Sequence, residues 1–336
     1  MSGKPEILPE NSRKRRKFAA ISIAALFLLT ALLFVILKTL PETPEAHSCA
    51  FPVMGTIAQI TVYAPEAELN RADELTRREF DRVTALCSLY DPASELSRIN
   101  ASAADAPVVC SPDMWQILMR AKRAYRESGG QFDITVKPLM DLWGFYRKRD
   151  QVPSDAEIDR TMKMVGFDKL RFDEKARTVF FTVPGMALDL GGIGKGFAVD
   201  LAAKALTEAG FTSGVIDLGG NLRMLTQPPP GKKFYNVAIR DPHDRDRVLP
   251  ETLQVTPGMA VSTSGDYERF VIYNGKKYSH LLSPLTGRPG SVSAVTVVAP
   301  TAMDADVYST SCALGGETTA AEIQKNDPET TIRFTR

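Results

Sequence analysis

The chain has 336 residues and a formal net charge of +1, with 44% hydrophobic and 24% charged residues, which is ordinary for a globular protein. Residues 1–17 carry six Lys/Arg against two acidic residues and so hold +4, which leaves −3 for the rest. A mildly acidic body lacks the basic surface that nucleic-acid binding requires, so we expect no nucleic-acid partner.

The N-terminal region contains one long apolar run. Residues 18–37 carry no charge, and only Ser22 and Thr30 among them are polar. Twenty helical residues span about 30 Å, the thickness of a membrane's hydrocarbon core. The basic cluster at 13–17 places the N-terminus in the cytoplasm. The sequence therefore predicts four segments: a basic cytoplasmic segment (1–17), a transmembrane anchor (18–37), a linker (38–50) and one body (51–336).

A cleaved signal peptide is the alternative to an anchor. The run is longer than the usual 7–15-residue apolar core of a signal peptide, and no clear Ala-x-Ala site follows it, which favours retention. The expected location is a single pass through the inner membrane with the body on the periplasmic side. Such an exported body permits a disulfide. The spacing of the cysteines does not indicate which of them would pair. It argues against a zinc site, since no C-x-x-C pair occurs among Cys49, Cys87, Cys110 and Cys312.

The first half of the body is predicted to be mixed. Residues 57–63 have strand composition, and a helix is expected over 70–89 with Asn70 as its cap. Residues 90–100 are expected to form a loop. Ser111 and Pro112 are a typical helix start, and that helix should end at the glycines 129–130. Further on, we expect a charged surface excursion (147–160) and strands at 179–183 and 187–190.

The second half is predicted to be rich in strands. A helix is expected at 196–209, and strands are expected at 215–218, 234–240, 268–273, 277–282 and 292–299. Asn274-Gly275 is a strong hairpin signal. A last helix, 302–314, precedes a weak tail. Helices and strands mix without strict alternation, so the sequence favours an α+β fold with a largely antiparallel sheet.

Residues 188–200 hold four glycines and Lys195 between an apolar run and a helix. Such a loop suits either a phosphate at the helix N-terminus or a plain tight turn. It is not a P-loop, because Gly196 stands where Ser or Thr should hold a metal, and it is not G-x-G-x-x-G in register. Lys195 is either a phosphate contact or an exposed surface lysine.

Two further segments offer reactive groups. Thr301 and Asp304 fit a capping box, which leaves Asp306 without a capping task. Asp306 and Thr310 are four residues apart and share one helix face, where their oxygens suit Mg²⁺; a solvated acidic helix start is the alternative. Of the three histidines, His280 ends a strand before a turn and is the best candidate base, against a satisfied core histidine.

Taken in order, these segments resemble the FAD:protein FMN transferase family, the ApbE-like flavin transferases, over residues 54–315. The resemblance rests on eight motifs in the family's order: residues 54–56, 94–100, 132–136, 188–200, 217–221, 262–269, 280–289 and 305–310.

The resemblance implies an ApbE-like α+β fold and a phosphoryl transfer. Such enzymes cut the pyrophosphate of FAD, pass FMN to a Thr or Ser hydroxyl of a partner, here an extracytoplasmic flavoprotein subunit, and release AMP. The family's Mg²⁺ ligands map onto Asp306, Thr310 and the carbonyl of Gly194, and its base maps onto His280. Its FAD contacts map onto Met54, Tyr90, Phe132, Asp133 and Lys195. Phosphoryl transfer asks mainly for positioning and charge neutralisation, which these residues supply.

One position departs from the family pattern. Ser283 stands where the family usually has Asp in His-x-x-Asp-Pro-x-Thr-Gly, which bears on how the turn after His280 is held. Two other functions compete with transfer. A hydrolase would release FMN and AMP to water, and a flavin-binding module would not turn over at all.

Overall fold

The computed structural model describes residues 19, 22–23, 25–32, 34, 44–244, 247–290 and 294–335. Two compact units are distinguished, Met1–Pro44 and Glu45–Arg336. In the first unit, the described residues of the predicted anchor are helical and exposed, and the others of 18–37 lie outside the described residues. Within the described residues, no helix has both the length and the apolar composition that a membrane crossing requires.

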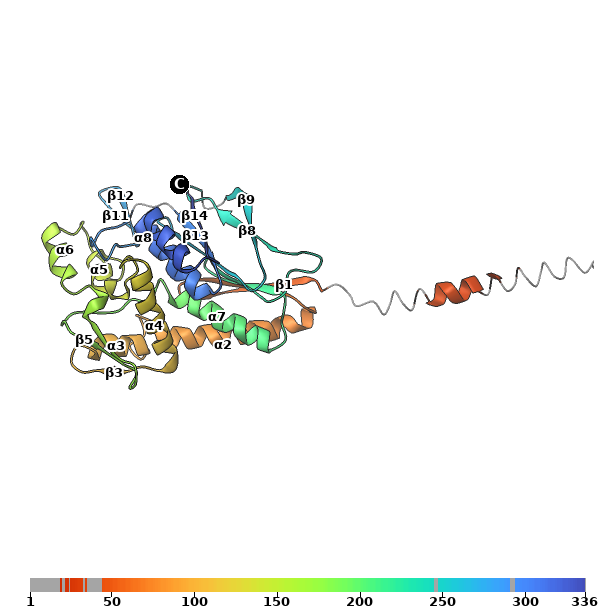
Figure 1. Ribbon diagram of the computed structural model, residues 1–336, viewed down its shortest axis with the longest axis horizontal. Helices are drawn as coiled ribbons and strands as arrows, with labels where there is room; N and C mark the ends of the chain where they lie inside the picture. Colours follow the sequence, from red (N-terminus) through yellow and green to blue (C-terminus); the bar gives the residue numbers. More distant parts are fainter. Residues whose placement is uncertain are drawn as a thin grey trace, which may run out of the picture. The chain divides into compact units, whose positions relative to one another are not determined.

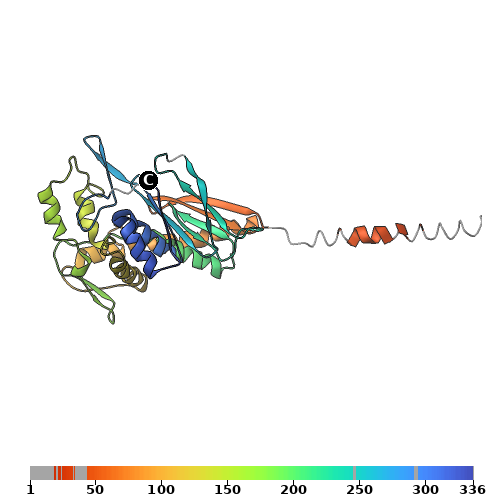
Figure 2. The same cartoon turned by 45° about the horizontal axis from the view of Figure 1, so that its top comes forward.

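The second unit is built on one sheet whose neighbouring strands all pair antiparallel, as predicted. Successive side chains along a strand point to opposite faces, so the sheet has two faces that pack against different elements. Figures 1 and 2 show the sheet with helices on one of its sides. The strands, in spatial order, are β1 (Ala46–Val53), β2 (Thr56–Tyr63), β6 (Gly214–Leu218), β7 (Asn221–Met224), β10 (Ala260–Gly265), β13 (Ala294–Ala299) and β14 (Thr331–Thr335).

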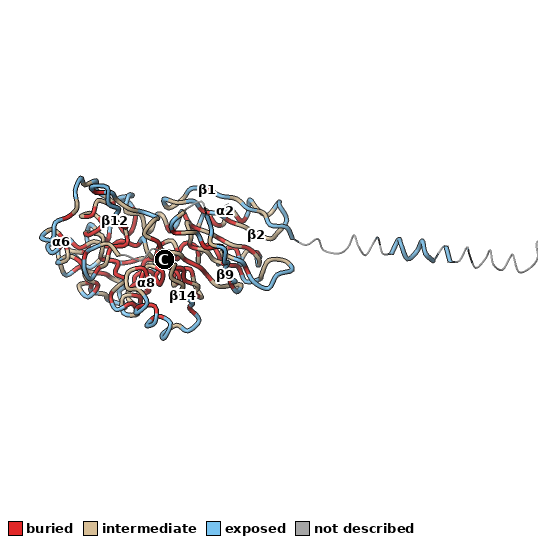
Figure 3. Tube along the Cα trace, turned by 90° about the horizontal axis from the view of Figure 1, so that it is seen from above, coloured by how far each residue is buried: buried red, intermediate tan, exposed pale blue. Residues whose placement is uncertain are grey.

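The two faces are covered by different elements. One face packs into the main core, with Ile216 and Val295 fully buried. Figure 3 shows this core as the red interior of the body. Its cover includes the helices α2 (Leu69–Cys87), α7 (Gly194–Glu208) and α8 (Ala302–Asn326). The other face carries Val215 and Val261 against the hairpin of β8 (Tyr235–Arg240) and β9 (Val248–Val255).

The remaining elements complete the body, and those within residues 137–162 and 270–279 contribute to a second buried cluster around Trp143, which is 1% exposed. In Figures 1 and 2 these elements gather at the end of the body away from β1. They are α3 (Glu95–Ser102), β3 (Val108–Val109), α4 (Pro112–Glu127), η2 (Ile134–Val136), α5 (Lys137–Leu142), α6 (Asp155–Met162), η3 (Phe167–Lys169), β4 (Leu170–Asp173), β5 (Thr178–Phe181), β11 (Phe270–Tyr273) and β12 (Lys276–Ser279). The short helix η1 (Glu66–Glu68) is not in this group and leads directly into α2.

Several predicted elements are confirmed by their local chemistry. Ser111 caps α4 by accepting from the Met114 N–H, with Pro112 at the first helical position. Asn274 and Gly275 turn the β11–β12 hairpin with φ values of 49° and 75°. The predicted helix over 302–314 is present, and the non-helical Gly316 (φ 66°) separates it from the rest of α8, which continues to Asn326.

Other predictions are wrong for identifiable reasons. The predicted linker 38–50 ends too late, because β1 begins at Ala46 and pairs with β2. The predicted loop 90–100 contains α3, which Ser94 caps. Asn70 is not a cap, since α2 begins one residue earlier after Glu68. The segment 187–190 is not a strand, because the backbone N–H and C=O of Leu188 bond to the side chain of Asn100.

The glycines of the loop serve close packing rather than unusual backbone angles. None of Gly191, Gly192, Gly194 and Gly196, all within the described part of the chain, has a positive φ. A Cβ on Gly196 would lie 2.7 Å from the Cα of Met303, so α7 and α8 meet where no side chain fits. The sequence suggested that these glycines form a tight turn. Gly196 instead allows the backbones of α7 and α8 to approach each other closely.

We expect Gly196→Ala to lower the free energy of unfolding by about 1–3 kcal/mol, because the added methyl group overpacks the contact between α7 and α8. Urea unfolding followed by circular dichroism measures this. The matched control is Gly194→Ala in the same helix, where the added Cβ would lie 3.9 Å from Cys87, an ordinary contact. Equal stability of the two variants would show that the contact tolerates a side chain.

Candidate active site

The start of α7 and the start of α8 bring the predicted metal and phosphate groups together. The Gly196 N–H donates to Asp306 Oδ2 at 3.0 Å, and Lys195 Nζ lies 3.8 Å from Asp306 Oδ1. Lys195 Nζ also donates to the carbonyl of Gly191 at 3.1 Å. Asp306 is only 2% exposed, and its burial raises the pKa of its carboxyl group. The glycine loop and Asp306 thus form one site, with Gly194 as the first residue of α7.

Thr310 and Phe132 border the same loop. A Cβ on Gly192 would lie 3.2 Å from both Thr310 Oγ1 and a ring carbon of Phe132. Any larger residue at Gly192 would therefore press on a predicted metal ligand and a predicted flavin contact at once. Phe132 is 4% exposed, because its ring is packed against this loop and the surrounding core.

Two contacts fix the N-terminus of α8, and sequence reasoning missed both. Asp200 on α7 accepts from the N–H groups of Ala302 and Met303, each at 2.9 Å. Arg120 on α4 donates to the Asp304 carboxylate at 2.5 Å. Both acids complement the positive end of a helix, and Asp200 also lies 3.4 Å from Arg223. Asp306 is therefore carried by a helix start that is held from two sides.

His280 is held in its neutral form and in one tautomer. Its Nδ1 lies 3.0 Å from the carbonyl oxygen of Arg269, which can only accept. Nδ1 therefore carries the hydrogen, and the lone pair is on Nε2. Burial lowers the pKa of His280 to about 4, and the charges of Lys195 and Arg269 act in the same direction. The neutral base thus lies within the electrostatic reach of Lys195.

The predicted flavin contacts divide into two groups. Tyr90 is 75% exposed and meets Tyr146 edge to face at 6.0 Å, while the Tyr146 hydroxyl donates to Asp189 at 2.7 Å. Asp189 in turn accepts from the Gly191 N–H at 2.8 Å, so this aromatic pair adjoins the glycine loop. Tyr146 and Asp189 were not predicted; the second lies within the glycine-rich motif itself.

Asp133 and Met54 have structural tasks of their own. Both carboxylate oxygens of Asp133 already accept hydrogen bonds, from Thr135 and from the Phe167 N–H at 2.9 Å, and burial raises its pKa. Met54 occupies the β1–β2 turn with a φ of 49°, where Asn or Gly is usual, and such strain is typical of functional sites. The partly buried Met54 packs against the main core, which also contains Leu190 and Ile193.

The donor set of Asp306 and Thr310 fits Mg²⁺. Mg²⁺ prefers hard oxygen ligands and keeps several of its waters, so one carboxylate, one hydroxyl and a carbonyl suffice. Positive charge favours the ionised form of a buried carboxylate, and the Lys195 ammonium lies 3.8 Å from that of Asp306. Within the described part of the chain, no cluster of three His, Cys, Asp or Glu residues could hold a metal.

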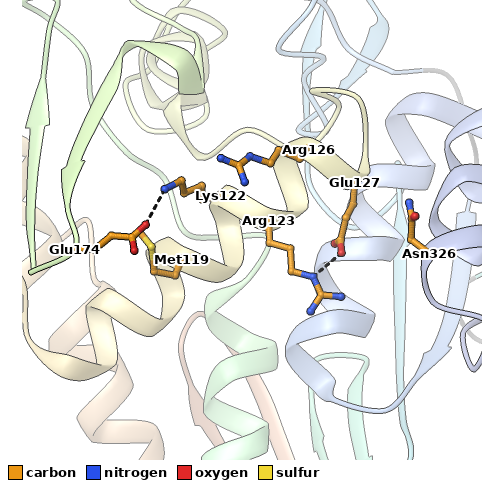
Figure 4. A pocket seen from close by; sticks show the side chains of 7 residues that line it. All are labelled: Met119, Lys122, Arg123, Arg126, Glu127, Glu174 and Asn326. Carbon is orange, nitrogen blue, oxygen red and sulfur yellow. Dashed lines mark hydrogen bonds and ion pairs between the residues drawn. The ribbon is translucent and has the colours of Figure 1, made fainter.

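A separate hollow of about 500 Å³ lies along α4, and none of the predicted site residues lines it. Figure 4 shows its two ion pairs, Lys122 with Glu174 at 3.2 Å and Arg123 with Glu127 at 2.5 Å. Its charges largely compensate one another. The hollow therefore offers no reactive group to the site at the glycine loop.

Comparisons with known proteins agree with this fold and identify the family. A model of the ApbE family matches residues 54–334. The FAD:protein FMN transferase of Salmonella typhimurium is 32% identical over 321 residues, covering 92% of this chain and 89% of the relative. The flavin transferase ApbE from Vibrio cholerae is 30% identical with a TM-score of 0.73, and an ApbE protein from Thermotoga maritima is 29% identical with a TM-score of 0.77; each covers 86% of this chain and is itself 93% covered.

The fold shared with these structures and the large share of the chain that the relatives match place this chain among the enzymes of the flavin transferase class. The chain belongs to the ApbE family, which confirms the resemblance seen in its motifs.

Proposed function

We propose that this chain transfers FMN from FAD to a Thr or Ser hydroxyl of a partner flavoprotein and releases AMP, with Mg²⁺ bound at Asp306, Thr310 and the carbonyl of Gly194. The observation that carries the proposal is that Lys195 Nζ lies 3.8 Å from the buried Asp306 carboxylate at the glycine loop. The charge of Lys195 also lowers the pKa of His280. The names of the relatives support the overall reaction.

The residues divide the work of such a transfer. Lys195 supplies positive charge to the pyrophosphate, and the tightly packed loop allows the backbone to approach it. His280 takes the proton of the acceptor hydroxyl at Nε2, because Nδ1 is committed to the Arg269 carbonyl. Tyr90 and Phe132 offer ring faces and edges to the flavin. When bound, Mg²⁺ supplies charge neutralisation for the pyrophosphate and the leaving AMP.

The departure at Ser283 leaves the turn after His280 intact. The Ser283 N–H donates to the carbonyl of Arg288 at 2.8 Å, and its hydroxyl accepts from the Leu285 N–H at 3.3 Å. The Gly287 N–H closes the turn onto the Ser283 carbonyl at 2.8 Å. A hydroxyl thus replaces the usual carboxylate as the cap of this turn, and His280 is oriented by Arg269 instead.

The rate of transfer should not fall near pH 6.5, where an unshifted histidine titrates. Because burial lowers the pKa of His280 to about 4, the base stays neutral well below that pH, and activity is lost only as the pH falls toward 4. Measuring kcat/KM for the acceptor between pH 5 and 8 checks this. A break between pH 6 and 7 that disappears in His280→Gln would show that the imidazole is solvated and that the shift is wrong.

The function itself is tested by incubating the chain with FAD, Mg²⁺ and a candidate extracytoplasmic flavoprotein subunit, followed by mass spectrometry of the partner. A gain in mass equal to FMN, with release of AMP, is expected. FMN and AMP released beside an unmodified partner would favour a hydrolase. Bound FAD that is never consumed would favour a flavin-binding module.

We also propose that residues 18–37 anchor the body at the periplasmic side of the inner membrane. The uncharged run and the basic residues 13–17 before it support this. Fractionation of cells that express the whole chain should find it in the membrane pellet, resistant to high salt. Recovery in the soluble periplasmic fraction, shortened at its N-terminus, would favour a cleaved signal peptide.

A further inference from the structure

A row of buried polar side chains connects the sheet to Thr310. Ser262 Oγ donates to Asn221 Oδ1 at 2.8 Å and lies 3.2 Å from Ser309 Oγ. Ser309 Oγ lies 2.8 Å from Ser264 Oγ, which is 3.3 Å from Thr310 Oγ1. Asn221, Ser262 and Ser309 are at most 2% exposed. We call these five residues the hydroxyl row.

The register of the sheet places the hydroxyl row on one face. Ser262 and Ser264 alternate with Val261 along β10, so they point toward α8 while Val261 faces the opposite cluster. Thr263 points with Val261, and its hydroxyl pairs with Thr296 at 2.9 Å instead. The strand β10 therefore carries Ser262 and Ser264, whose hydroxyl groups belong to the hydroxyl row. The hydroxyl group of Thr263, between them, does not belong to it.

The proton of each hydroxyl has a preferred direction. An amide oxygen only accepts, so Ser262 gives its proton to Asn221. Ser309 then donates to Ser262, sharing its proton with the Asp306 carbonyl at 3.0 Å, and Ser264 donates to Ser309. Thr310 is left to donate to Ser264. Its oxygen lone pairs are then directed away from the row.

We propose that Ser264, supported by Ser309, is a positioning residue that orients the Thr310 hydroxyl as a pure acceptor toward a divalent cation. This rests on the proposed function, because the cation is the one assigned to Asp306 and Thr310. Hydrogen bonds behind a ligand fix its orientation and increase its basicity, and losing them weakens metal binding. A threonine hydroxyl free to rotate would present its proton to the metal for part of the time.

The test is calorimetric titration of the whole chain with Mn²⁺ in the presence of ADP, which shares the diphosphate of FAD. Ser264→Ala should weaken Mn²⁺ binding by roughly 10- to 100-fold. Ser264→Thr keeps the hydroxyl and should recover most of the affinity. The matched control is Thr263→Val, which removes the adjacent hydroxyl on the opposite face of β10 and should leave the affinity unchanged.

Each outcome decides a different claim. A loss in Ser264→Ala that Ser264→Thr restores, at unchanged melting temperature, supports the row. Binding as tight in Ser264→Ala as in the unaltered chain overturns the role of the row and leaves the proposed metal site standing. If the unaltered chain binds no Mn²⁺, the metal site and the row are both wrong, whether or not FMN transfer takes place.

Discussion

Asp306→Ala should reduce Mg²⁺-dependent turnover by about 10³-fold. A bound metal contributes several kcal/mol of charge stabilisation to phosphoryl transfer, and each 1.4 kcal/mol is a factor of ten in rate. Asp306 is a buried carboxylate at the loop, and it both accepts from the Gly196 N–H and lies 3.8 Å from the Lys195 ammonium. Release of AMP from FAD, measured over a Mg²⁺ titration, is the direct readout.

Two companion variants separate charge from packing. Asp306→Asn keeps an oxygen acceptor for the Gly196 N–H but removes the charge, so it should lose nearly as much activity as Asp306→Ala. Glu322→Gln removes an exposed carboxylate farther along α8 and should leave turnover unchanged. Full activity in Asp306→Asn would mean that the carboxylate acts only as a structural acceptor, and the assigned metal site would then be wrong.

His280→Ala should slow FMN transfer by about 10²- to 10⁴-fold while leaving FAD affinity within a factor of a few. The range is that of a positioned general base, and His280 makes no contact that a bound nucleotide requires in the proposal. Single-turnover transfer to the acceptor gives the rate, and quenching of flavin fluorescence gives the affinity.

His243→Ala is the control for this variant, because His243 is exposed and lies in a loop between strands. It should transfer FMN at the normal rate. A His280→Ala chain that binds FAD poorly would instead make His280 a residue that positions the substrate. A chain that transfers normally would remove it from the mechanism.

Much of the fold was predictable where local chemistry decides the structure. The cap at Ser111 and the Asn274-Gly275 turn depend on neighbours within three residues, and both are confirmed. The strand expected at 187–190 failed because Leu188 bonds to Asn100, 88 residues away. The strand β10 was missed because its sequence, Ala-Val-Ser-Thr-Ser-Gly, alternates in packing partners rather than in hydrophobicity.

The sequence predicted groups that the structure brings together, Lys195 and Asp306, but not the residues that hold them in place. Helical spacing placed Asp306 and Thr310 on one face, and the four glycines within residues 188–200 indicated the loop. Asp200, which holds α8, and Ser264, which adjoins Thr310, are ordinary polar residues in the sequence. Their tasks depend on partners that only the tertiary fold brings near, so no local pattern reveals them.

The junction between α7 and α8 also sets the order in which the enzyme becomes competent during synthesis. The Gly196 N–H and its partner Asp306 are separated by 110 positions, and Asp200 reaches Ala302 over 102. A growing chain that ends before residue 300 possesses the glycine loop but lacks the carboxylate that completes it. Since the chain emerges from its N-terminal side, the contact between the glycine loop and Asp306 must wait for the last tenth of the polypeptide. The candidate site is therefore complete only after nearly the whole chain has been made.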